Sequence, residues 1–223
     1  MPARLPLFPL GLVLVPGLVL PLHVFEERYR VLVHDLLALP EAEREFGVVA
    51  IRSGREVGED GVLALHEVGC TARLRHAEPY EDGRFDLVTT GTRRFRLVGF
   101  AHDKPYLVGE VEALPEAGGR AGEAEVLVAA VQQAITAYVE ALAGAGADQP
   151  ELPELPDDAR TLSYLVCAAV RADLDDRQGL LELPDDAGRL RAGLALLRRE
   201  ARLLRTLSAV PAPELTRAPL NPN

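Results

Sequence analysis

The spacing of apolar residues changes near the middle of the chain. Up to residue 113, short apolar or alternating runs are separated by proline and glycine, a pattern typical of strands and turns. From residue 121 to residue 209, apolar residues recur every three or four positions, which predicts helices. The segment 114–122 between them is rich in Pro, Gly and Ala, as expected of a linker. We therefore predict an α+β protein with a β-rich subdomain over 1–115, a helical subdomain over 121–209 and an extended tail over 210–223.

The first half predicts several short strands around one helix. Leu10–Val15 is an apolar run between Pro9 and Pro16-Gly17, as expected of a buried strand that ends in a turn. Glu26–Leu39 has apolar residues at helical spacing and is stopped by Pro40. Further strands are expected at Phe46–Ile51, 63–77, Arg84–Thr89, Arg93–Phe100 and Pro105–Leu114, with loops at Ser53-Gly54 and Gly58–Gly61 and a hairpin turn at Glu81-Asp82-Gly83. This arrangement favours a small, partly open barrel over a parallel α/β sheet.

The second half predicts a bundle of about four amphipathic helices. The apolar stripe of the first helix consists of Leu127, Val131, Ala134, Ile135, Tyr138 and Leu142. An aspartate just before a helix accepts hydrogen bonds from free backbone N–H groups, so we expect caps at Asp157 or Asp158, at Asp173 and at Asp185. The last helix turns a stripe of leucines inward. Its opposite face, which we expect to be solvated, carries Arg189, Arg191, Arg198, Arg199, Arg202 and Arg205.

Composition narrows the possible classes of protein. Of the 223 residues 48% are apolar, enough for a substantial core. The net charge is −10 and both halves are acidic, which argues against a nucleic-acid-binding domain, because such a domain needs basic residues to neutralise phosphates. Neither a membrane span nor a signal peptide is expected, since prolines and charges interrupt every long apolar stretch. Cys70 and Cys167, without a CxxC partner, predict buried reduced thiols and a cytoplasmic protein.

The side chains that catalysis would need are scarce or badly placed. The single lysine, Lys104, follows no glycine-rich loop that would cradle phosphates. No serine lies in a GxSxG elbow, and a Ser–Lys dyad would require Lys104. The five histidines form neither HExxH nor a close pair. Acidic pairs at 157–158, 175–176 and 185–186 lie at or near predicted helix starts, where carboxylates satisfy backbone donors. We therefore predict no catalytic, cofactor-binding or metal-binding residues.

Several motifs, taken together, resemble the substrate-binding (LON) domain of Lon-type proteases. The opening of that domain is matched by Leu5-Pro6-Leu7-Phe8-Pro9-Leu10, Val15-Pro16-Gly17 and Leu20–Tyr29. The resemblance continues with Phe46-Gly47-Val48-Val49, Glu56-Val57-Gly58, Glu67–Ala72, Gly91–Leu97, Arg177–Glu182 and Arg189-Leu190. These matching segments span nearly the whole chain in order, and their joint match is specific.

The resemblance implies a PUA-like, β-rich pseudo-barrel with one helix, followed by the helical bundle. In the full protease this domain catches unfolded or tagged polypeptide. Because the chain ends where the ATPase would begin, we expect a stand-alone, non-catalytic module that binds unfolded or extended polypeptide and uses no cofactor. The motifs are also expected to have structural roles: Phe25 and Tyr29 pin the helix to the barrel, Arg28 pairs with a carboxylate, and Gly91 permits a bulge or a positive φ.

Binding of an extended chain calls for apolar side chains beside an exposed strand edge, which we expect near residues 13–24 and the barrel–bundle cleft. The candidate polypeptide-binding residues are Val13, Val15, Leu18, Leu20, Leu22 and Val24. A candidate polar or structural motif consists of Glu26, Arg28, Tyr29, Arg94 and Phe95.

Two other kinds of partner remain open at this stage. The chain is alternatively an adaptor or regulator that docks on one specific partner protein. A third reading is an RNA or small-ligand binder, since the PUA-like class includes RNA readers. That reading requires a contiguous positive cleft, for which the candidates are Arg73, Arg75, Arg93, Arg94 and Arg96. Nucleic acid and membrane are not the expected partners, and the sequence does not specify an oligomeric state.

Overall fold

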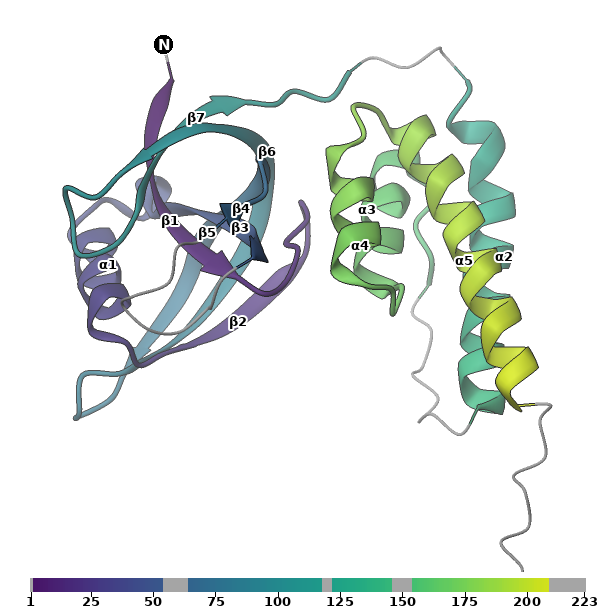
Figure 1. Ribbon diagram of the computed structural model, residues 1–223, viewed down its shortest axis with the longest axis horizontal. Helices are drawn as coiled ribbons and strands as arrows, with labels where there is room; N and C mark the ends of the chain where they lie inside the picture. The colour runs from purple at the N-terminus through teal and green to yellow at the C-terminus, as the bar shows by residue number, and fades with distance from the viewer. Residues whose placement is uncertain (1, 54–63, 118–121, 146–153, 209–223) are drawn as a thin grey trace, which may run out of the picture.

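The protein consists of a β-barrel and, beside it, a bundle of helices (Figure 1). The computed structural model describes residues 2–53, 64–117, 122–145 and 154–208. The predicted α+β fold, a β-rich barrel with one α-helix followed by about four helices, is confirmed. The predicted loop at Gly58–Gly61 and the predicted tail over 210–223 lie outside the described residues.

Five strands close the barrel. The strands of the first half are β1 (Ala3–Leu10), β2 (Val19–Val24), β3 (Glu45–Ser53), β4 (Ala64–Leu65), β5 (Val68–Pro79), β6 (Phe85–Ala101) and β7 (Val108–Ala113). β1 pairs parallel with β3 and antiparallel with β7, and antiparallel pairs join β7 to β6, β6 to β5 and β5 to β3. β2 and β4 lie outside this ring, because β2 pairs with β6 and β4 with β3.

Several predicted strands differ from those observed. The first strand ends at Leu10, so the prediction of a strand over Leu10–Val15 was wrong: β1 uses residues 3–10 for its pairs with β7 and β3, and the chain then leaves the sheet. The two strands predicted within 84–100 are one continuous strand, β6. Between the two predicted strands it contains a bulge, in which Thr92 and Arg93 oppose the single residue Thr71. A bulge disturbs the alternation of side chains but does not end the strand. The sequence pattern therefore suggested a break where the strand continues.

One helix, α1 (Glu27–Leu37), packs on the barrel core, and the short 3₁₀ turn η1 (Glu41–Glu43) follows it. Tyr29 is buried and its ring stacks on that of Phe8 at a centroid distance of 4.0 Å. Tyr29 therefore fixes the helix to the barrel, as expected. Phe25 was expected to help but is 52% exposed, because it lies after the end of β2 and points away from the core.

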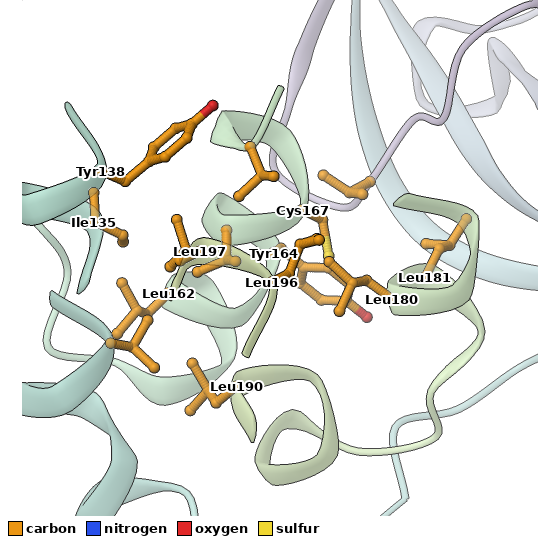
Figure 2. Close-up of a cluster of buried hydrophobic side chains, with 14 of the residues drawn as sticks. Ile135, Tyr138, Leu162, Tyr164, Cys167, Leu180, Leu181, Leu190, Leu196 and Leu197 are labelled. Atoms are coloured by element: carbon orange, nitrogen blue, oxygen red, sulfur yellow. The ribbon is translucent and has the colours of Figure 1, made fainter. Parts of the chain in front are cut away.

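The second half forms α2 (Glu125–Gly144), α3 (Ala159–Ala169), α4 (Leu174–Glu182) and α5 (Asp186–Ser208). The predicted aspartate caps are present: Asp158 accepts from the Thr161 N–H, Asp173 from the Asp176 N–H and Asp185 from the Gly188 N–H. Figure 2 shows side chains from all four helices around one core, with Ile135, Tyr138, Leu162, Tyr164, Cys167, Leu180, Leu181, Leu190, Leu196 and Leu197 labelled. Burial of this apolar stripe holds the bundle together.

Helix α2 is unusually apolar for a helix at the surface. By length and composition alone it would be able to span a membrane, with a mean hydropathy of 1.5 over an 18-residue window. A helix from the core of a soluble protein passes the same test, and α2 packs on α3 and α5. However, only 33% of that window is buried, and the remaining residues of this apolar helix are partly or fully exposed.

The segment between β1 and β2 joins the barrel to the bundle. Leu14 packs in the barrel core, whereas Val13 and Val15 pack in the core of the bundle. Gly91 of β6 holds this segment, since its N–H donates to the Leu18 carbonyl and its own carbonyl accepts from Gly17, both at 2.9 Å. An added Cβ at Gly91 would lie 2.2 Å from the Val15 carbonyl oxygen. Its φ is not positive, so the close approach of the chain, together with the bulge, is what requires glycine here.

Candidate functional site

Strand β2 leaves one of its edges open. It pairs with the first half of β6, in a register that sets Val19 opposite Thr90 and Val24 opposite Phe85. The second half of β6 pairs with β7 instead. Along the described part of the chain β2 has no other strand partner, so its second edge is free to pair with another extended chain.

Hydrogen bonding on the β6 side fixes which backbone groups this edge offers. The Leu18 carbonyl accepts from the Gly91 N–H at 2.9 Å, and the Leu20 carbonyl accepts from the Thr89 hydroxyl at 2.8 Å. Bonded and non-bonded pairs alternate in an antiparallel ladder, so the backbone groups of Val19, Pro21 and His23 point away from β6. Proline has no N–H, so the edge presents three carbonyl groups but only two donors.

Apolar side chains cover the outer face next to this edge. Pro21 lies opposite Val88 of β6, and Val19 is its neighbour on the same face. Val19 is 57% exposed and Val88 is 40% exposed, which is high for β-branched residues in a sheet. Phe25 and Tyr80 extend the exposed apolar surface past the end of β2. We call these five residues, Val19, Pro21, Phe25, Tyr80 and Val88, the β2 surface.

A small polar cluster borders the β2 surface. His23 Nδ1 lies 2.6 Å from Asp86 Oδ1, and the Tyr80 hydroxyl donates to Asp86 Oδ2 at 2.6 Å. The hydrogen bonds from Tyr80 and His23 hold the pKa of Asp86 below its usual value. No serine or cysteine contacts this cluster among the described residues, so it offers hydrogen-bonding groups to a peptide rather than a nucleophile.

The candidate polypeptide-binding residues chosen from the sequence lie mostly inside the protein. Val13, Val15, Leu20 and Val24 are buried, so the prediction that they lie on a binding surface was wrong. Leu18 and Leu22 are half-buried. Within β2 the error is one of alternation, because the even-numbered positions face the barrel core and the odd-numbered ones face solvent. Val13 and Val15 lie before β2, in the segment that crosses to the core of the bundle. The sequence signal was available: residues 19–24 alternate, and a proline inside such a run is typical of an edge strand.

The residues of the candidate polar motif make contacts within the protein itself. Arg28 forms an ion pair with Glu26 at 2.9 Å, and Tyr29 stacks on Phe8 as described above. Phe95 is buried in the barrel beneath Gly69, where an added Cβ would approach the ring to 2.4 Å. Arg94 belongs to a larger cluster, which joins the barrel to the bundle.

Four side chains form this junction cluster: Arg94 of β6, Glu116 of the linker, Tyr164 of α3 and Arg189 of α5. Arg94 donates to Glu116 at 3.0 Å, and Arg189 donates to the other carboxylate oxygen at 2.5 Å. The Tyr164 hydroxyl also donates to Glu116. Both arginines are almost completely buried, at 1% and 0% exposure. The cluster therefore links the barrel, the linker and the helical bundle.

Backbone carbonyls at the end of α4 accept further hydrogen bonds from the two arginines of the junction cluster. Arg94 donates to the carbonyls of Leu181 and Pro184, and Arg189 donates to that of Leu183. Cations are favourable at a helix C-terminus, which helps to offset the burial of two arginines beside one carboxylate. Arg189 was expected on the solvated face of the last helix. That expectation was wrong, because the first turn of α5 lies at the junction, where Glu116 and the end of α4 supply acceptors.

The chemistry available elsewhere is limited. Ser163 donates to the Arg160 carbonyl and accepts from Arg189, whereas Lys104 pairs with Asp35 on the barrel, so these two residues form no dyad. Both cysteines are free and buried, and burial raises the pKa of each thiol to about 12. Such thiols are poor nucleophiles at neutral pH.

A hollow of about 520 Å³ opens between the barrel and α4. Its ionisable groups include His66, which lies 4.0 Å from Asp175 and 4.0 Å from Glu182. Gln178 crosses the hollow by donating to the Val68 carbonyl and to Glu182, both at 2.9 Å. No group of three or more His, Cys, Asp or Glu side chains is placed to hold a metal ion in the described ranges.

The arginines considered for RNA binding do not form a free positive cleft. Arg73 and Arg93 both pair with Glu45, at 2.7 and 2.6 Å. Arg94 is buried in the junction cluster, and Arg96 lies 3.6 Å from Glu67. Carboxylates of the chain itself therefore occupy most of the predicted phosphate-binding groups.

Comparison with known proteins gives a consistent result. The family described as ATP-dependent protease La (LON) substrate-binding domain matches residues 4–199. The chain is similar to Lon protease 2 of Myxococcus xanthus and to Lon protease of Anaeromyxobacter dehalogenans, in each case 29% identical over 206 residues and 92% of this chain. It spans about a quarter of the length of these relatives, 24% of each.

Two solved structures are also similar. One is a Lon N-terminal domain protein from Xanthomonas campestris, with a TM-score of 0.60 and 29% identity, covering 86% of this chain and 98% of that chain. The other is the N-terminal domain of the Mycobacterium avium complex Lon protease, with a TM-score of 0.60 and 19% identity, covering 88% and 98%. At 19% identity, this second similarity shows a shared fold alone.

Proposed function

Since the chain belongs to the family of ATP-dependent protease La (LON) substrate-binding domains, we propose that it binds extended polypeptide along the open edge of β2 and does not transform it. The family description supports substrate binding by such domains. The place and manner of binding are our proposal.

The observation that carries the proposal is the open edge of β2, flanked by the β2 surface. An added strand would pair with the outward carbonyl and N–H groups of Val19 and His23, while Val19, Pro21 and Val88 would contact its side chains. Main-chain bonds make such binding tolerant of sequence, and the apolar face favours chains with apolar residues at alternate positions. Both properties suit a binder of unfolded segments.

Pro21 limits how strongly this edge pairs. An acceptor of the added strand that lies opposite Pro21 finds no donor. Natural edge strands use proline to prevent uncontrolled aggregation, and here it would keep binding weak and reversible. We therefore expect a module that catches and releases chains.

The experiment compares binding of a labelled denatured protein, reduced and carboxymethylated α-lactalbumin, with binding of its native form, by fluorescence anisotropy. We expect at least tenfold preference for the denatured form. The double variant Val19→Asp with Val88→Asp should weaken binding by about tenfold or more, since burying the exposed part of each valine contributes about 1 kcal/mol.

The matched control is Val98→Asp, which changes another exposed valine of β6 outside the β2 surface. Circular dichroism should show that all variants remain folded. Equal affinity for denatured and native α-lactalbumin would refute the proposal, and so would an equal loss of binding in the control variant.

Docking on a single partner protein is the main alternative. It predicts a stoichiometric complex with one native protein and no general preference for denatured chains, so the same comparison separates the two functions. Cytoplasmic location remains a prediction from the sequence.

A further inference from the structure

A second surface, separate from the β2 edge, lies on the bundle. Helices α2 and α5 pack side by side on the part of the bundle away from the barrel (Figure 1). A groove of about 810 Å³ runs between them. Its sides include Ala130, Ala134 and Ala137 of α2 and Ala201 of α5. These small side chains fill little of the space between the helices, and the surface between them is therefore hollow.

The α2 side of the groove is mostly apolar, with Gln133 as its polar residue, and the described chain covers it only in part. Ala130, Ala134 and Ala137 are spaced by four and three residues, so they lie on one face of the helix. They are only half-buried, and Val126 near the start of α2 is 80% exposed. α2 contains no lysine or arginine. A protein that keeps such a helix at its surface gains if a partner covers it.

The α5 side carries a row of three arginines. Arg198, Arg202 and Arg205 line the groove, again at spacings of four and three residues. They are exposed, and none of them pairs with a carboxylate in the described part of the chain. The guanidinium of Arg205 reaches across to the Ala137 carbonyl at 3.2 Å. The neighbouring Arg199 differs, because it pairs with Asp176 and with Glu200.

No carboxylate of the described chain offsets the repulsion within this row. Like charges three or four residues apart destabilise a helix by a few tenths of a kcal/mol per pair. The chain has a net charge of −10, and many of its other arginines pair with its own carboxylates. An unpaired cationic row beside an apolar groove is thus complementary to a ligand that is apolar on one face and acidic on the adjoining flank.

The shape of the groove favours a helix as that ligand. A strand laid between two helices would find no backbone partners there, whereas a helix satisfies its own N–H and C=O groups. A third helix also packs well into the furrow between two others. A lipid surface fits less well, because the groove is concave and its apolar lining, four alanines and the buried Leu197, offers no large exposed side chain to insert into a bilayer.

We propose that the α2–α5 groove docks an amphipathic helix of a partner protein, which has small apolar residues on one face and aspartate or glutamate at positions i, i+4 and i+7 beside it. This acidic helix is a partner distinct from the extended chains proposed for β2. The module would then hold an unfolded segment with its barrel and a folded partner with its bundle.

The test uses three 18-residue helical peptides that share an alanine and leucine face and carry Glu, Gln or Lys along the flank. Binding to the full chain is measured by fluorescence anisotropy at low and high salt. We expect the Glu peptide to bind at least tenfold more tightly than the Lys peptide, with a difference that shrinks at high salt. In the variant Arg198→Glu with Arg202→Glu, the order should reverse, with the Lys peptide now binding more tightly.

The matched control is Arg160→Glu with Arg171→Glu, two exposed arginines outside the groove, and it should leave the preference for the Glu peptide unchanged. The proposal is overturned if the three peptides bind equally or if the charge reversal does not change their order. It is also overturned if the reversal abolishes binding to phosphatidylserine vesicles but not to the Glu peptide, since the surface would then be a membrane site. Concentration-dependent self-association that the same reversal abolishes would assign the groove to a second copy of the chain.

Discussion

Replacing Glu116 with glutamine should destabilise the protein more than replacing an exposed carboxylate. Glu116 accepts from Arg94 and Arg189, which are 1% and 0% exposed, and removal of its charge leaves both cations in the interior. Breaking a buried ion pair in this way costs about 3–5 kcal/mol. We expect the lower end, about 3 kcal/mol, because the arginines keep their hydrogen bonds to backbone carbonyls and water reaches part of Glu116.

The assay is urea denaturation at pH 7, followed by far-ultraviolet circular dichroism and analysed by linear extrapolation. The matched control is Glu123→Gln, since Glu123 pairs with Arg191, an arginine whose side chain is 58% exposed. An exposed pair contributes only about 0–1 kcal/mol. A loss below about 1 kcal/mol for Glu116→Gln, or a loss equal to that of the control, would refute the view that the junction cluster holds barrel and bundle together.

The effect of Glu116 should also depend on pH. Burial alone would raise the pKa of Glu116, but hydrogen bonds from Tyr164 and Arg189 and the charges of both arginines outweigh it, so the pKa lies below its usual value. A depressed carboxyl pKa contributes stability above the unfolded value of about 4.3, and this contribution disappears as pH falls through the folded value. The difference in unfolding free energy between the wild type and Glu116→Gln should therefore shrink below about pH 4. Growth of the difference in acid would contradict this sign.

Two further outcomes follow from the packing. Gly91→Ala should lose about 1–3 kcal/mol in the same urea assay because its Cβ would meet the Val15 carbonyl, whereas Gly179→Ala, with open space around it, should be neutral or slightly stabilising. Cys70 and Cys167 should react with a disulfide reagent such as DTNB at pH 8 only as fast as the protein unfolds, because both are buried with a thiol pKa of about 12. Rapid labelling of the folded protein would contradict that burial.

Periodicity predicted most of the helical half. The stripe of α2 and the capping aspartates are local signals, since an amphipathic face and a cap depend on residues within a turn or two. The start of the barrel was harder. Residues 11–15 are as apolar as a buried strand, but they cross from barrel to bundle, and apolar composition does not distinguish these two ways of being buried.

The candidate site shows the same division. The sequence placed the candidate binding region near residues 13–24, where the open edge of β2 lies, but the residues that it chose within that strand face inward. A shift of one position exchanges the two faces of a strand, so the missing information was the pairing with β6. The exposed partner Val88 comes from that distant strand, and no local pattern links it to Val19.

By itself, the sequence determined the division into a β-rich half and a helical half, the positions of the helices and the helix caps, because each depends on residues close together in the chain. The tertiary structure decided which charged side chains are buried and which groups meet. Arg189 has the same spacing as the exposed arginines of its helix, yet it is buried because Glu116 lies 73 positions earlier and folds back onto it. The open edge of β2 and the α2–α5 groove likewise exist only because distant segments pack together, or fail to, in three dimensions.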